Sequence, residues 1–85
     1  MKIADKLDKI LTKKKLSLAY SLYGGLYFTH NKKEKLDKIA VELNKCLGKY
    51  DIKAKKESPD KVKLFPIKGL GRQILSEYKE KYGNN

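Results

Sequence analysis

The sequence has few of the residues from which disulfides and metal sites are built. Among 85 residues it contains one cysteine, Cys46, one histidine, His30, and no tryptophan. A lone cysteine excludes an internal disulfide and is typical of a reducing compartment. A lone histidine excludes paired-histidine zinc sites, and no cysteine stands at helical spacing from it. We therefore expect neither a metal nor another cofactor.

Long apolar runs are also missing. The longest uncharged stretch, residues 16–31, is interrupted by serine, glycine, threonine and histidine. It is shorter than the roughly 20 apolar residues of a transmembrane helix. Residues 1–6 mix charges and contain no apolar signal core. We therefore expect no membrane partner and a cytoplasmic location.

Acidic residues are scarce: 10 Asp and Glu stand against 21 Lys and Arg, a net charge of +11. They lie among lysines, and no acidic pair stands apart as a general acid and base, so we expect no enzyme. The chain is 40% hydrophobic and its basic residues run through apolar periodicity, which predicts one small folded domain over residues 1–85. Self-repulsion at this charge would be relieved by a polyanionic partner.

Three segments have apolar residues at helical spacing. They are residues 2–13, residues 32–47, and a last segment that follows Gly69 and Gly71. For the second segment, Asn31 and Glu34 resemble a capping box, and Gly48 suits the end of the helix. The predicted apolar stripes are Ile3, Leu7, Ile10 and Leu11; Leu36, Ile39, Ala40, Leu43, Cys46 and Leu47; and Leu70, Ile74, Leu75, Tyr78 and Tyr82.

Residues 16–30 allow two interpretations. Leu16, Leu18, Tyr20 and Leu22 alternate with other residues, and a second alternating run follows Gly24-Gly25. This pattern favours a hairpin whose turn needs a positive φ. The alternative is a helix that ends at the glycines.

Residues 51–68 predict a second hairpin around the turn Ser58-Pro59-Asp60-Lys61. Pro66 cannot donate to a strand ladder, so its strand lies at a sheet edge or ends its pairing there. The resulting order is α-β-β-α-β-β-α. It predicts an α+β fold with an antiparallel sheet and helices packed on one face.

The second hairpin carries the best candidate site. Lys53 and Lys55 alternate with Ile52 and Ala54, so they share a face that can also include Lys63. A lysine-lined ribbon fits a DNA major groove or a phosphate backbone. The other interpretation is a solvated coat, or lysines that keep a sheet edge from aggregating. Lys56 and Lys61, near the turn, are expected to extend this surface.

Three residues outside the hairpin complete the predicted site. Tyr23 and Tyr27 point away from the Leu16–Leu22 face, so they could stack on bases or be ordinary strand residues. Arg72 lies where a helix begins, and free amides there favour a phosphate, although a flexible break explains the glycines too. The predicted nucleic-acid-binding residues are Lys53, Lys55, Lys56, Lys61, Lys63, Tyr23, Tyr27 and Arg72.

The element order and the string from Leu18 to Phe28, LAYSLYGGLYF, resemble one half-domain of a LAGLIDADG homing endonuclease. Residues 31–56, a helix followed by a basic strand, are also similar to a later segment of that fold. The resemblance implies a saddle-shaped sheet lying on DNA, and a helix over residues 16–25. The family's metal-binding acidic residue has no counterpart at Tyr23, Gly24 or Gly25, so the resemblance implies binding without cleavage.

These observations predict a non-catalytic protein that binds nucleic acid, DNA rather than RNA, through phosphate contacts. The alternatives are an RNA-binding or ribosome-associated protein, a module for an acidic protein partner, and a small basic nuclease. A homodimer is a further expectation, because symmetric pairing would enlarge a small core.

Overall fold

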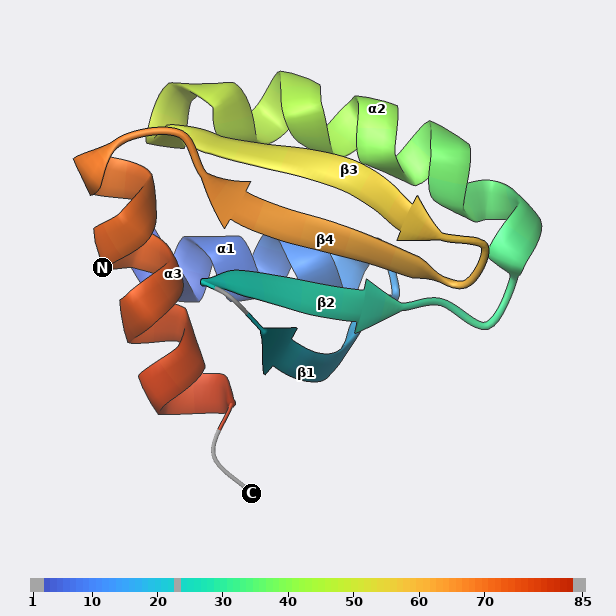
Figure 1. Ribbon diagram of the computed structural model, residues 1–85, viewed down its shortest axis with the longest axis horizontal. Coiled ribbons are helices and arrows are strands. Elements are labelled where there is room, and N and C mark those ends of the chain that lie inside the picture. The colour runs from blue at the N-terminus through green and yellow to red at the C-terminus, as the bar shows by residue number, and fades with distance from the viewer. Residues whose placement is uncertain (1–2, 23, 84–85) are drawn as a thin grey trace.

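The computed structural model describes residues 3–22 and 24–83. The helices are α1 (Ile3–Lys13), α2 (Leu36–Leu47) and α3 (Gly69–Tyr82), with short 3₁₀ turns η1 (Lys33–Lys35) and η2 (Gly48–Tyr50) on either side of α2 (Figure 1). The strands are β1 (Ser17–Leu22), β2 (Gly25–Thr29), β3 (Ile52–Ser58) and β4 (Lys61–Pro66). This is the predicted element order.

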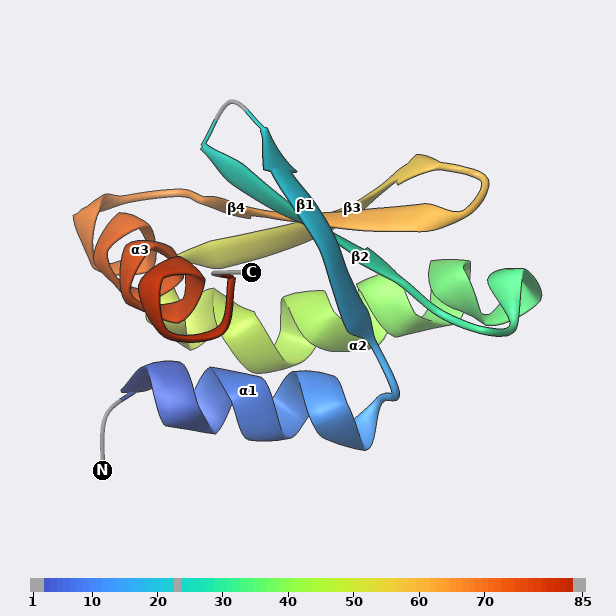
Figure 2. The same cartoon turned by 90° about the horizontal axis from the view of Figure 1, so that it is seen from below.

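The four strands form one antiparallel sheet in the order β1-β2-β4-β3. The helices lie on one side of it (Figure 2). The predicted fold class is therefore confirmed. We call the opposite side, which bears Tyr20, Tyr27, Lys53, Lys55, Lys61, Lys63 and Phe65, the open face.

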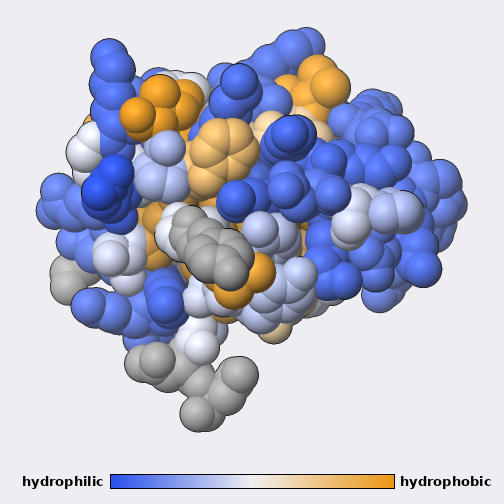
Figure 3. Space-filling model, viewed as in Figure 1, coloured by the Kyte–Doolittle hydropathy of each residue, from blue (hydrophilic) through white to orange (hydrophobic). Residues whose placement is uncertain are grey.

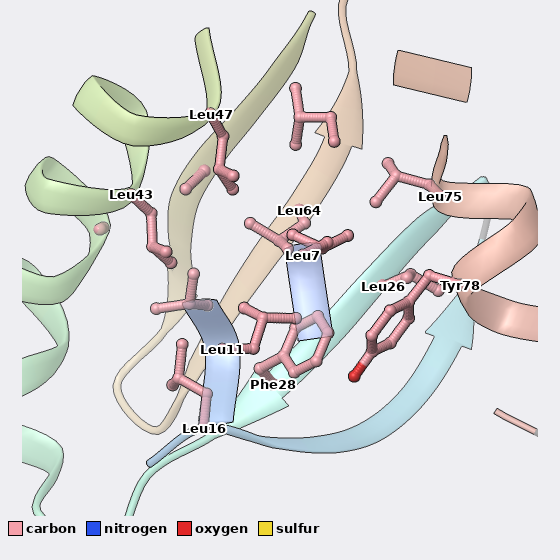
Figure 4. Packing of buried hydrophobic residues seen from close by; sticks show 14 of the residues in the cluster. Leu7, Leu11, Leu16, Leu26, Phe28, Leu43, Leu47, Leu64, Leu75 and Tyr78 are labelled. Atoms are coloured by element: carbon pink, nitrogen blue, oxygen red, sulfur yellow. The ribbon is translucent and has the colours of Figure 1, made fainter. Parts of the chain in front are cut away.

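The core fills the space between the sheet and the helices. Alternate residues of β2 and β4, such as Phe28 and Leu64, point towards the helices, as the period of two in a strand requires. Leu7 and Leu11 of α1 and Leu75 of α3 lie against these strands in the same cluster (Figure 4). The apolar stripes of the helices therefore bury against one face of the sheet, and the open face carries lysine and aromatic side chains.

The first hairpin is confirmed, and the helical alternative for residues 16–25 is wrong. Leu22 pairs with Gly25, and Gly24 has a φ of 79°, the left-handed backbone that glycine tolerates best. The register shifts between Leu18 and Tyr20, as in a β-bulge. A bulge reverses the alternation, so the predicted common face of Leu16, Leu18, Tyr20 and Leu22 is wrong beyond Leu18.

Several expectations for α2 need correction. The α-helix begins at Leu36, four residues later than predicted, and neither η1 nor α2 has a side-chain cap at its start, so the predicted capping box is absent. Gly48 stays right-handed and opens η2, and Asp51 takes the left-handed conformation instead (φ 59°). Cys46 is exposed rather than part of the buried stripe, because its position falls just outside the face that packs on β3.

The start of α3 packs tightly against Asp51. The Asp51 carbonyl oxygen accepts the Ile67 N–H at 2.7 Å, and a Cβ on Gly71 would overlap the same carbonyl group. Gly71 therefore permits a close approach of helix and strand. Gly69 and Gly71 lie inside α3 rather than before it. Leu70 was predicted to belong to the apolar face of this helix, but it is 41% exposed.

The outer edge of β3 is covered by a side chain of α2. The Asn44 amide donates to the Ala54 carbonyl at 2.9 Å and accepts the Ala54 N–H at 2.7 Å. At Ala54, the Asn44 amide thus makes the two hydrogen bonds that a further strand would make. This arrangement blocks edge-to-edge pairing at β3.

Candidate nucleic-acid interface

One row of side chains crosses the open face from edge to edge. Tyr20 lies opposite Tyr27, Tyr27 opposite Lys63, and Lys63 opposite Lys55. Each pair belongs to neighbouring strands in the order β1, β2, β4, β3. The row places two aromatic rings on one half of the face and two cations on the other.

The lysines of the second hairpin share the open face. Lys53 and Lys55 are exposed, and within the described residues no ion pair is recorded for either. Lys61 forms an ion pair with Asp60 at 3.2 Å. Hydrogen bonds from Ser58 and then Lys61 hold the pKa of the Asp60 carboxyl below its usual value. Among the described residues, Lys53, Lys55 and Lys63 thus contribute positive charge without an ion-pair partner within 4.0 Å.

Lys63 is held in place by its surroundings. A Cβ on Gly25 would overlap the Lys63 side chain, so this glycine makes room for the lysine stem to cross β2. The Lys63 ammonium lies 5.6 Å from the ring centroids of both Tyr27 and Phe65. Both distances are within the range of a cation–π interaction. The aromatic rings thus help to orient the ammonium group of Lys63, which is a half-buried residue.

Tyr20 and Tyr27 form a stacked pair with ring centroids 4.8 Å apart and planes inclined by 19°. Tyr27 is only 6% exposed, whereas Tyr20 is 45% exposed. Tyr27 is therefore on the predicted face, but Tyr20 and Lys63 cover it and no base can reach it. The accessible ring is Tyr20, with the Lys61 ammonium 5.9 Å from its centroid. The sequence analysis missed Tyr20 because the bulge moves it to the open face.

Lys56 does not join the open face. It lies opposite Val62 on the helix side of the sheet, where its ammonium is 3.4 Å from the Asp37 carboxylate of α2. Simple alternation along β3 already indicates this orientation, and nearness to the turn was a misleading guide. Arg72 lies at the other end of the face, in the first turn of α3. With Lys63 and Phe65 it lines a hollow of about 450 Å³.

The remaining predicted residue, Tyr23, lies outside the described residues.

Figure 3 shows how the open face divides by polarity. Hydrophilic side chains cover the end where β3 and β4 turn, and apolar side chains reach the surface nearer α3. Lys61 lies at the end where β3 and β4 turn, and Lys53, Phe65 and Arg72 lie nearer α3.

Within residues 3–22 and 24–83, no group of His, Cys, Asp and Glu side chains is arranged to hold a metal ion. No helix in the same part of the chain is both long enough and apolar enough to cross a membrane. No protein-family model, curated protein or solved structure matches this chain.

Proposed function

We propose that the protein binds nucleic acid through the open face, with DNA preferred over RNA, and performs no chemistry on it. The observation that carries this proposal is the position of Lys55 opposite Lys63, with Lys53 and Lys61 on the same face. Like charges directly opposite each other across a sheet are destabilising. A row of phosphates would relieve this repulsion.

The binding mechanism is phosphate neutralisation. Each lysine that contacts a phosphate releases condensed counterions, which makes the affinity fall steeply with salt. The four open-face lysines predict a slope of log K against log salt of about −3.6, at about −0.9 per phosphate. Arg72, if it reaches the same backbone, brings the slope to about −4.5.

A second candidate function is binding of unpaired RNA, supported by the half-exposed ring of Tyr20. The Tyr27 ring stacks on one face of the Tyr20 ring. The Lys61 ammonium is close enough to Tyr20 to contact the phosphate of a base stacked there. Stacking on aromatic side chains is how many proteins hold single strands, because every base has a π-face. A duplex offers few such faces, so the form of the preferred nucleic acid distinguishes the two candidates.

The test is fluorescence anisotropy with labelled duplex DNA, duplex RNA and single strands of each, at two salt concentrations. We expect the tightest binding for duplex DNA and the predicted salt slope. Lys55→Gln should reduce the slope by about 0.9, and Lys56→Gln, its neighbour on the other side of the same strand, should leave it unchanged. Absence of binding to all four probes at low salt, or equal effects of the two variants, would contradict the proposal.

The homodimer also stays a proposal. Sedimentation of the free protein and of its complex with one short duplex gives the number of chains in each. The proposed binding of nucleic acid does not depend on the LAGLIDADG resemblance. That resemblance implies a helix over residues 16–25, where the structure has β1 (Ser17–Leu22) and the start of β2 at Gly25.

A further inference from the structure

A second basic surface lies away from the open face, where the end of α1 meets the start of α2. Six lysines line a hollow of about 450 Å³ there, which we call the basic hollow. They come from three parts of the chain: Lys13, Lys14 and Lys15 at and just after the end of α1, Lys32 and Lys35 at η1, and Lys38 in α2. Cations that are distant in sequence thus converge on one concave surface.

The charge of the basic hollow is poorly balanced. Among the described residues that line it, Glu42 is the only acid, and its carboxylate is 3.0 Å from the Lys14 ammonium. The hydrogen bond from Lys14, its charge and the charges of Lys38 and Lys45 lower the pKa of Glu42. Ile39 forms an apolar part of the wall. A cleft with one sign of charge and low-dielectric walls concentrates counter-ions.

The backbone conformation of Lys15 gives a second, independent observation. Lys15 has a φ of 60°, and the N–H groups of Lys15 and Leu16 donate to the carbonyls of Thr12 and Leu11 at 2.9 and 3.0 Å. This is the Schellman ending of a helix, whose left-handed position normally holds glycine. A lysine there is strained, and such strain is often retained for function. The turn lets three consecutive lysines line the same hollow, although successive residues of a helix point about 100° apart.

His30 adds a neutral donor to the basic hollow. Its Nδ1 accepts the Lys32 N–H at 2.8 Å. The neutral imidazole therefore carries its hydrogen on Nε2, an assignment that follows from this hydrogen bond. The side chain of His30 lines the hollow. An Nε2–H group is one that can donate to an anionic oxygen.

We propose that the basic hollow binds a compact anion with several adjacent phosphate groups, at a site separate from the open face. Lysine ammonium groups bind phosphate oxygens as point charges and need no fixed approach direction. Their convergence suits a ligand whose charges are close together, whereas the lysines of the open face are spread along strands. An inorganic polyphosphate and the triphosphate of a nucleotide share this chemistry. This proposal does not rest on the proposed binding of nucleic acid by the open face.

The test is isothermal titration calorimetry with inorganic tripolyphosphate, ATP and orthophosphate as probes. We expect saturable binding of one tripolyphosphate per chain, and about tenfold weaker binding after Lys35→Gln, since a hydrogen bond to a charged group is lost. Lys33→Gln is the matched control, because Lys33 belongs to the same 3₁₀ turn but does not line the hollow. Equal losses in the two variants, or no saturable binding of tripolyphosphate, would overturn the proposal.

The other probes identify the source of the phosphates. ATP binding at least as tightly as tripolyphosphate indicates a nucleotide, and weaker ATP binding indicates a free polyphosphate. Orthophosphate should bind far more weakly than either, because it offers one group to several lysines. If it binds as tightly as tripolyphosphate, adjacent phosphates are not what the site recognises, and the proposal fails.

Lys15→Gly separates function from structure. Glycine suits the left-handed position, so the variant should unfold at a higher temperature than the original protein, yet bind tripolyphosphate several-fold more weakly. A purely structural Lys15 would change only stability. Unchanged tripolyphosphate affinity in Lys15→Gly and in Lys35→Gln would overturn the proposal, while binding of duplex DNA by the open face should persist in both.

Discussion

Lys55 and Lys63 lie directly opposite each other on β3 and β4, with both side chains on the open face. The Lys63 stem lies over Gly25 of β2, and its ammonium is 5.6 Å from the ring centroids of Tyr27 and Phe65. The free protein thus has two cations at one cross-strand position of its surface. Binding of a phosphate between them would turn an unfavourable pair into a favourable arrangement.

Lys55→Glu should raise the free energy of unfolding of the free protein and weaken its binding to DNA. The substitution replaces a repulsive cross-strand pair by an attractive one, worth about 0.2 to 1 kcal/mol. Urea unfolding at low and high salt measures the change, which should shrink when salt screens the charges. Lys33→Glu, on exposed η1, controls for the lower net charge. Equal stabilisation by both substitutions would show that the Lys55–Lys63 pair has no special effect.

Tyr20→Ala should weaken binding of single strands more than binding of duplexes. Loss of base stacking costs about 1 to 3 kcal/mol per base, or roughly a 5- to 150-fold loss of affinity. Tyr20→Leu keeps an apolar cover over Tyr27 but removes the stacking surface, so it should show the same preference with less effect on stability. Anisotropy with single-stranded and duplex probes measures both. If neither variant distinguishes the probes, Tyr20 does not contact unpaired bases.

Asn44→Ala should destabilise the fold by about 1 to 3 kcal/mol, because the N–H and C=O groups of Ala54 lose their partners. It should also increase aggregation, since the edge of β3 becomes free to pair with another chain. Urea unfolding and light scattering measure the two effects. Cys46→Ser, at an exposed position of the same helix, should change stability by no more than about 0.5 kcal/mol. Equal effects of the two substitutions would contradict this role of Asn44.

Alkaline pH should destabilise the protein through Tyr78. Burial raises the pKa of Tyr78 to about 12 from 10 in the unfolded chain. Between these values the unfolded chain ionises while the folded one does not, so the stabilisation is fully present below pH 10 and is lost as the pH rises to 12. The loss is about 2 to 3 kcal/mol for a shift of this size.

Tyr78→Phe should remove that part of the pH dependence, measured by urea unfolding between pH 9 and 12. A smaller loss remains in the variant, because the hydrogen bonds to Asp5 also raise the pKa of Lys81 and Tyr82. Lys81 loses its charge, and with it this stabilisation, as the pH rises through its raised pKa. Identical pH profiles for the original protein and Tyr78→Phe would contradict the role of Tyr78.

The local patterns in the sequence predicted most elements of the fold, but not their boundaries. Alternation indicated both hairpins, and helical spacing indicated all three helices. The start of α2 and the end signal at Gly48 were wrong because the backbone there follows two 3₁₀ turns, which have no distinct apolar period. The bulge after Leu18 was also missed. A bulge adds one residue to a strand without changing the types of residue from which the strand is predicted.

The placement of Lys53, Lys55 and Lys63 on one face followed from strand periodicity and the turn at Ser58-Pro59. The accessibility of the aromatic residues could not be predicted from strand periodicity. Tyr20 covers Tyr27 only because β1 pairs with β2 in a shifted register. Such a contact depends on geometry between strands, which no periodicity along one strand describes.

The chain's apolar periods were enough to indicate an α+β fold, because they depend on short-range spacing. The charge was enough to propose a polyanionic partner, because net charge depends on composition alone. The pairing of β2 with β4, which puts Tyr27 beside Lys63, depends on how the whole sheet buries its apolar face. The basic hollow likewise exists only because folding brings Lys13, Lys14 and Lys15 next to Lys32, Lys35 and Lys38. Long-range packing selects these neighbours, and local sequence carries no record of them.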